Sequence, residues 1–266
     1  MNVFIRELRA YRKSTLIWIA SLSILVFVFM MIFPAFTKDV NTSKLIISSL
    51  PQAVRSGLDI SLQTFFTIYG FYAYLFTFVV LAGAVQAMNL GVGVLSKEES
   101  GKTVDFLLTK PISRVKVITS KLLAVVSLLI FTNVIFSIVS LVTAMMVSTT
   151  NFDSKIFLLI SATLLLVQII FLALGMLMSV IIPKIKSTIS VALPTVFTFF
   201  VIGTLGAIIG NDNVKYLSPF KFFSSEYIIS HGAYELKFLI IEAVIVVVAI
   251  IACYAVYIKK DIKAVL

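Results

Sequence analysis

The amino-acid sequence predicts an all-α membrane protein with six transmembrane helices and both termini in the cytoplasm. The first observation behind this prediction is composition: 60% of the 266 residues are hydrophobic, only 13% are charged, and the mean hydropathy is +1.11. The second is that the apolar residues gather in long runs, each able to cross a bilayer. The third is the distribution of basic residues between the loops. We expect a single transmembrane domain over residues 1–266, with no additional soluble domain.

The six apolar runs are expected to be helices. A helix satisfies its backbone hydrogen bonds within one segment, and the runs lack the alternation of barrel strands. The predicted spans are Leu16–Phe36, Phe65–Val94, Leu122–Val147, Ile156–Ile182, Ile189–Ile209 and Leu236–Ile258. Of the 22 Lys and Arg residues, 15 lie in the termini and in the loops after the second and fourth spans. This excess predicts that those segments are cytoplasmic.

The N-terminal residues 1–14 are expected to form an interfacial helix. Phe4, Leu8 and Tyr11 fall on one helical face, and most of the Arg and Lys residues fall on the other. Such a helix would lie against anionic lipid. The alternative is a plain basic anchor for the first span. A cleaved signal peptide is not expected, because the following apolar run is too long and no small-residue cleavage site stands out.

Short outer helices are predicted before the second and sixth spans. Apolar residues recur at near-helical spacing in the first of these segments, at Leu45, Ile46, Leu50, Val54 and Leu58. In the second segment Phe220, Phe223 and Tyr227 are spaced for one helical face, and Pro219 suits a first helical turn. The alternative is that these aromatic residues form only a belt at the level of the lipid headgroups.

Few polar side chains lie inside the predicted spans. The candidates for a pathway or for contacts between helices are Gln86, Asn89, Asn133, Gln168 and Glu242. The four amides are suited to interhelical hydrogen bonds. Glu242 is the ionisable residue well within a run, which makes it a functional candidate, although its place in the outer part of the last span also lets it reach water. No relay of buried acids or His suggests a proton-coupled carrier.

Gly206 and Gly210 form a GxxxG motif in the fifth predicted span. This spacing lets two helices approach closely, either within one chain or between two copies. The motif is common in membrane helices, so it predicts a packing surface without deciding between these two cases.

A hydrophilic island at residues 95–121 separates the second and third predicted spans, and two enzymatic interpretations of it fail. Gly101–Thr103 looks like the end of a phosphate-binding loop, but Ser96 stands where the first Gly is required and no strand precedes the loop. Glu98–Glu99 is reminiscent of a membrane metalloprotease, but the single His231 cannot complete a zinc site. We predict no catalytic residue, cofactor or metal. We assign the net charge of +10 to cytoplasmic loops rather than to nucleic-acid binding.

The remaining interpretation of the island is a docking element for a cytosolic partner. Ser100 or Thr103 can cap a short amphipathic helix, Pro111 ends it, and Ser113 can cap the helix that leads into the third span. A partner that moves such a helix would move the two spans that hold it. The predicted contact residues are Glu98, Glu99, Gly101, Lys102, Thr103, Asp105, Phe106, Leu107, Leu108, Pro111 and Arg114.

At these residues the sequence resembles the permease subunits of type-2 ATP-binding-cassette (ABC) exporters. The signature of that family between its second and third spans is an acidic pair, a Gly, a Thr, an apolar pair, Pro-Ile-Ser-Arg and a Lys. The matching positions here are Glu98-Glu99, Gly101, Thr103, Leu107-Leu108, Pro111-Ile112-Ser113-Arg114 and Lys121. Lys102 stands where the family usually has its Thr, which is a small departure.

The resemblance implies that two permease chains, identical or homologous, pair in the bacterial plasma membrane and that two separate ATPase subunits bind below them. Glu98–Pro111 would be the coupling helix and Arg114 the anchor of its stem. The family's dimer contact, between first and fifth spans, would give Gly206 and Gly210 a role. The low charge of the spans suggests an amphipathic or hydrophobic cargo, such as an antimicrobial or secreted peptide. The alternatives are a stand-alone secondary transporter or channel, or a membrane sensor that docks a cytosolic partner.

Overall fold

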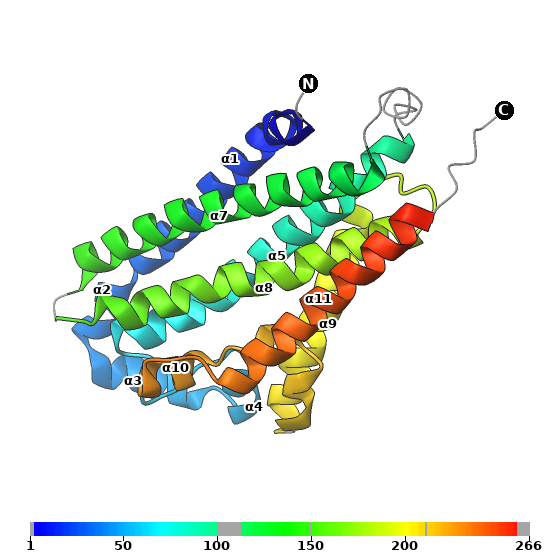
Figure 1. Cartoon of the computed structure of the whole chain (residues 1–266). Coiled ribbons are helices and arrows are strands. Elements are labelled where there is room, and N and C mark those ends of the chain that lie inside the picture. Colours follow the sequence, from blue (N-terminus) through cyan, green and yellow to red (C-terminus); the bar gives the residue numbers. More distant parts are fainter. Residues whose placement is uncertain (1–2, 101–112, 149–150, 211, 260–266) are drawn as a thin grey trace.

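The predicted fold class is confirmed by a computed structural model, which describes residues 3–100, 113–148, 151–210 and 212–259 (Figure 1). These residues contain helices and no strand. Six helices of the described part are long and apolar enough to cross a membrane, the first of them continued by α2 (Phe33–Lys38). They are α1 (Val3–Met30), α5 (Ile68–Ser100), α7 (Arg114–Val147), α8 (Ser154–Ile181), α9 (Ile189–Ile209) and α11 (Leu236–Lys259).

The helices α5 and α8 form the centre of the bundle. They pack along one another, with α1 and α7 on one side and α9 and α11 on the other (Figure 1). Two glycines allow the close approach of α5 and α8. A Cβ atom on Gly91 would lie 2.4 Å from the carbonyl oxygen of Leu172, and one on Gly175 would lie 2.7 Å from that of Met88. Larger residues at these positions would push the two backbones apart.

The N-terminal basic segment and the first span form one continuous helix, α1, with no break between residues 14 and 16. Its buried positions recur every three or four residues, as expected for a helix with one face against the bundle. They are Glu7, Tyr11, Thr15, Ile19, Leu22, Val26 and Met30. The inward face therefore begins within the basic segment. The interfacial position of residues 1–14 stays a prediction.

The two segments proposed to lie outside the membrane hold short helices. The first contains α3 (Val40–Ser49) and α4 (Gln52–Gly57), and Pro51 separates them because proline lacks the N–H that would continue a helix. Asp39 caps α3, and the hydrogen bonds from Thr42 hold the pKa of its carboxyl below the usual value. The second segment contains η1 (Asp212–Tyr216), η2 (Pro219–Lys221) and α10 (Ser225–His231). Their position on the outer surface stays a prediction.

The bundle has two distinct ends. The start of α1, the end of α5, the start of α7 and the end of α11 lie at one end, which we call the proximal end (Figure 1). The helices α3, α4 and α10 lie at the opposite, distal end. An even number of spans places the start of α1 and the end of α11 at the same end of the bundle. The assignment of the proximal end to the cytoplasm rests on the basic residues and stays a prediction.

Candidate functional site

The island lies at the proximal end, between α5 and α7. The helix α5 continues beyond the predicted end of the second span to Ser100, so the backbones of Glu98 and Glu99 belong to its last turn. The side chains of these two residues lie outside the described part of the structure. So do the other predicted docking residues Gly101, Lys102, Thr103, Asp105, Phe106, Leu107, Leu108 and Pro111. Their docking role stays a prediction.

The stem of the island begins where the sequence predicts it. The Ser113 hydroxyl accepts a hydrogen bond from the backbone N–H of Lys116 at 3.3 Å, and α7 starts at Arg114. Arg114 Nη1 donates to the carbonyl oxygen of Ile258 at 3.0 Å. Because Ile258 lies in the last turn of α11, the guanidinium also meets the negative end of that helix. The start of α7 is thereby attached to the end of α11.

A buried ion pair joins three helices close to the stem. Lys121 Nζ on α7 lies 3.0 Å from Glu7 Oε1 on α1 and 2.7 Å from the carbonyl oxygen of Val94 on α5. Lys121 is only 1% exposed and Glu7 only 7% exposed. Arg6 Nη2 approaches the same Glu7 oxygen at 3.4 Å. This proximal junction of Glu7, Val94 and Lys121 connects α1 to both helices that hold the island.

Glu7 was missed by the sequence analysis, although the resemblance included Lys121. The acid lies in a segment whose basic residues dominate the pattern. The signal that could have identified it is its position four residues before Tyr11, which places both side chains on one helical face. An acid on the inward face of a basic helix needs a basic partner, and Lys121 provides one from a distant part of the sequence.

Three of the predicted intramembrane polar residues lie in one hydrogen-bond network at the centre of the bundle. Asn133 Nδ2 donates to Gln168 Oε1 at 2.6 Å, and Gln168 Nε2 donates to Gln86 Oε1 at 3.1 Å. Gln86 Nε2 in turn donates to Thr132 Oγ1 at 3.2 Å. All four side chains are buried, and they come from α5, α7 and α8. These bonds tie the three helices together in the apolar interior.

The other two predicted polar residues lie apart from this network. Asn89 Oδ1 accepts a hydrogen bond from Thr188 Oγ1 at 2.5 Å, which fixes the loop before α9 to α5. Glu242 is buried on α11, and its Oε2 has no hydrogen-bond partner among the described residues. Nearby, Tyr234 donates to the carbonyl oxygen of Leu159 at 2.6 Å. Burial, with a smaller contribution from the Glu242 charge, raises the pKa of Tyr234 to about 12.

Both positions of the GxxxG motif need glycine for reasons within this chain. Gly206 is covered by Val214 of η1, since a Cβ atom on this glycine would lie 2.3 Å from a Val214 methyl group. Gly210 ends α9 in the left-handed conformation, with φ of 72°, and its N–H bonds to the carbonyl oxygen of Gly206. A role for Gly206 and Gly210 in pairing with a second chain stays a prediction.

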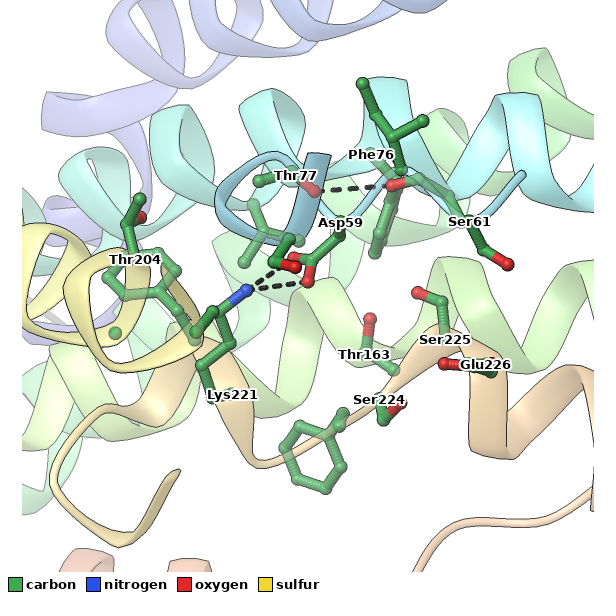
Figure 2. A pocket seen from close by; sticks show the side chains of 18 of the residues that line it. Asp59, Ser61, Phe76, Thr77, Thr163, Thr204, Lys221, Ser224, Ser225 and Glu226 are labelled. Carbon is green, nitrogen blue, oxygen red and sulfur yellow. Dashed lines mark hydrogen bonds and ion pairs between the residues drawn. The ribbon is translucent and has the colours of Figure 1, made fainter. Parts of the chain in front are cut away.

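A cavity of about 500 Å³ opens at the distal end, between α4, α5, α8, α9, η2 and α10. Figure 2 shows Asp59, which follows α4, meeting Lys221 of η2 across it. Lys221 Nζ lies 2.7 and 2.6 Å from the two carboxylate oxygens of Asp59. No residue of this distal cavity was singled out as a site from the sequence, apart from Gly206 and Gly210 as packing residues. Its lining comes from segments far apart in the chain.

The described residues include no group of three or more His, Cys, Asp or Glu that could hold a metal ion. The described part contains six helices long and apolar enough to cross a membrane, and with the family match below they make the chain a multi-pass plasma membrane protein. A family model described as ABC-2 family transporter protein matches residues 1–262, and the chain belongs to this family. It is therefore a permease of the ABC-2 type, the membrane component of a transporter and not itself the catalytic one. A search of curated proteins finds no match to the chain.

Proposed function

We propose that this permease is the membrane subunit of an exporter and that a separate ATPase subunit drives it through the island at residues 95–121. Membership of the ABC-2 family supports the transport role. The observation that carries the coupling step is the proximal junction. Its buried ion pair joins α1, α5 and α7 next to the points where the chain leaves the bundle for the island and returns from it.

In the proposed mechanism, ATP-driven movement of the partner pushes on the island and acts first on α5 and α7. The chain is helical up to Ser100 and again from Arg114, so each helix can transmit a displacement along its axis. Lys121 would pass the movement to α1 through Glu7. Arg114 would pass it to α11 through Ile258. One push would thus move four spans.

Copurification with an ATP-binding subunit tests this coupling. The chain should retain such a subunit through mild detergent, and the complex should hydrolyse ATP. Replacing both Glu98 and Glu99 by Ala should lower the ATPase activity, whereas Lys13→Ala, an exposed change on α1, should leave it unchanged. A partner that binds and works normally with the double Ala variant would show that the coupling assignment is wrong.

The proposed assembly contains two permease chains, identical or homologous, and two ATPase subunits. Its proposed cargo is an amphipathic or hydrophobic molecule, such as an antimicrobial or secreted peptide. Apolar side chains dominate the spans, and the buried amides of the centre are bonded to one another and to neighbouring groups of the bundle, which supports a cargo of low charge. Vesicles containing the complex should transport a fluorescent amphipathic peptide only with ATP. Equal transport without ATP would favour a stand-alone carrier or channel, and no transport at all would favour a sensor.

A further inference from the structure

The distal cavity reaches deep into the bundle. On α5 its lining runs from Gly70 to Val80, which corresponds to about 15 Å along a helix axis. The hydrocarbon core of a bilayer is about 30 Å thick, so this length corresponds to about half of that thickness. Val167 of α8 lies at the same depth, next in sequence to Gln168. The lining therefore reaches the residue next to Gln168 of the central hydrogen-bond network.

The lining changes character with depth. Asp59, Ser224 and Glu226 at the rim are exposed, whereas the deeper Phe76 and Val80 are buried. Hydroxyl groups line the cavity, as Figure 2 shows for Ser61, Thr77, Thr163, Thr204, Ser224 and Ser225. Aromatic rings line it as well, from Phe76, Phe200, Phe220 and Phe223. Exposed polar groups together with buried apolar groups match a ligand that has a polar head and an apolar chain. A cavity of about 500 Å³ is within the range of small-molecule sites.

The charges around the cavity indicate which head group it would hold. Asp59 and Lys221 neutralise each other through their ion pair. Arg55 lines the cavity as well, and its Nε is buried with no hydrogen-bond partner in the described ranges. A buried donor of this kind is costly to leave unpaired. The planar guanidinium is suited to a carboxylate or phosphate group, which can accept two of its hydrogen bonds. Glu226 is the remaining charged residue of the described lining, and it lies exposed on the first turn of α10.

We propose that the distal cavity binds an amphiphile whose carboxylate or phosphate group is held by Arg55 and whose apolar chain lies against the rings of Phe76, Phe200 and Phe223. Binding requires only this chain. The ligand would be either the exported cargo or a membrane lipid with a similar head group and chain. This identification rests on the proposed export function.

Tryptophan fluorescence in lipid nanodiscs tests the site without any ATPase subunit. The reporter is Phe200→Trp in a Trp18→Phe background, because Trp18 is the single native tryptophan. Brominated laurate should quench the reporter saturably. Arg55→Gln should raise the half-saturating concentration about 10-fold or more, because a charge-assisted hydrogen bond is lost. The matched change Lys44→Gln removes the same charge from an exposed position of α3 outside the cavity and should have no effect.

Two control probes separate specific binding from partition into the bilayer. Brominated dodecylammonium, with the same chain and the opposite charge, should quench the reporter only without saturation. A second reporter, Phe197→Trp, lies 44% exposed on α9 outside the cavity lining, and its quenching by laurate should not depend on Arg55. Equal affinity for laurate with and without the Arg55 side chain would overturn the proposal.

Thiol labelling provides a second measurement should the tryptophan reporter fold poorly. In a Cys253→Ala background, a membrane-impermeant thiol reagent should label Thr77→Cys, and laurate should protect it. Leu205→Cys, half exposed on α9 and outside the cavity lining, should stay unlabelled within the bilayer. Absence of labelling at Thr77→Cys in folded protein would overturn the proposal.

Native mass spectrometry distinguishes the two sources of the ligand. A phospholipid that is retained by the purified chain and lost with Arg55→Gln would identify the bilayer as the source. Laurate binding to a chain that retains no lipid would identify a ligand that arrives through water. If the chain neither retains a phospholipid through Arg55 nor binds laurate, the proposed site is wrong, but the export function is not affected. If the chain fails to recruit an ATPase subunit, the export function is wrong, but the proposed site is not affected.

Discussion

Replacing Lys121 by Met removes the buried cation of the proximal junction while keeping an unbranched side chain of similar length. The change leaves Glu7, which is 7% exposed, without its contact at 3.0 Å, and the carbonyl oxygen of Val94 without its contact at 2.7 Å. Breaking a buried ion pair costs about 3–5 kcal/mol. Arg6 lies 3.4 Å from the same Glu7 oxygen and can compensate in part. We therefore expect the lower limit, about 3 kcal/mol.

Thermal unfolding in detergent measures this loss. For a chain of this size, about 3 kcal/mol corresponds to a fall in the unfolding midpoint of about 6–12 °C. The control is Lys116→Met, an exposed change on the same helix, which should cost less than about 0.5 kcal/mol. The double variant Glu7→Gln with Lys121→Met should be more stable than the sum of the two single losses predicts, because neither charge is then buried alone. Additive losses, or a midpoint for Lys121→Met equal to that of the unchanged chain, would refute the reasoning.

Three further predictions concern the bundle and its distal end. Gly91→Ala should destabilise the chain by about 1–3 kcal/mol, because its Cβ would lie 2.4 Å from a backbone oxygen of α8; an unchanged unfolding midpoint would contradict that contact. Gln168→Leu should cost about 1–2 kcal/mol by removing the acceptor of Asn133, and the variant with Asn133→Leu as well should lose less than the summed costs; strict additivity would argue against the network. Asp59→Asn should cost at most about 1 kcal/mol, since the carboxylate side of its ion pair with Lys221 is 45% exposed, and the loss should shrink as salt is added to the unfolding assay; a loss independent of salt would contradict this assignment.

The sequence could predict the elements whose signal is local. The spans at Ile189–Ile209 and Leu236–Ile258 agree with α9 and α11 within one residue, because apolar length alone decides whether a helix can cross a bilayer. The start of α7 at Arg114 could be predicted for a similar reason, since Ser113 caps the helix through its own neighbours. The extension of α1 back to Val3 was less accessible, because its inward face in that segment depends on packing rather than on hydropathy.

The candidate sites could be predicted only as sets of residue types. Polar side chains such as Gln86 and Gln168 stand out in apolar runs, but their mutual hydrogen bond depends on how α5 and α8 are placed against each other. Gly91, which allows that placement, carries no signal of its own in the sequence. The resemblance identified the island from short-range spacing, and the docking role of its residues stays a prediction.

By itself, the sequence determined the membrane class, the six spans and the resemblance to ABC exporters, because hydropathy, charge and motif spacing are properties of neighbouring residues. Only the tertiary structure decided that Glu7 meets Lys121, 114 positions away, and that Arg55 and several Phe rings line one cavity formed by distant helices. The physical reason is that an apolar run is free to rotate about its axis in lipid until its few polar and small residues find partners, and those partners are supplied by other helices.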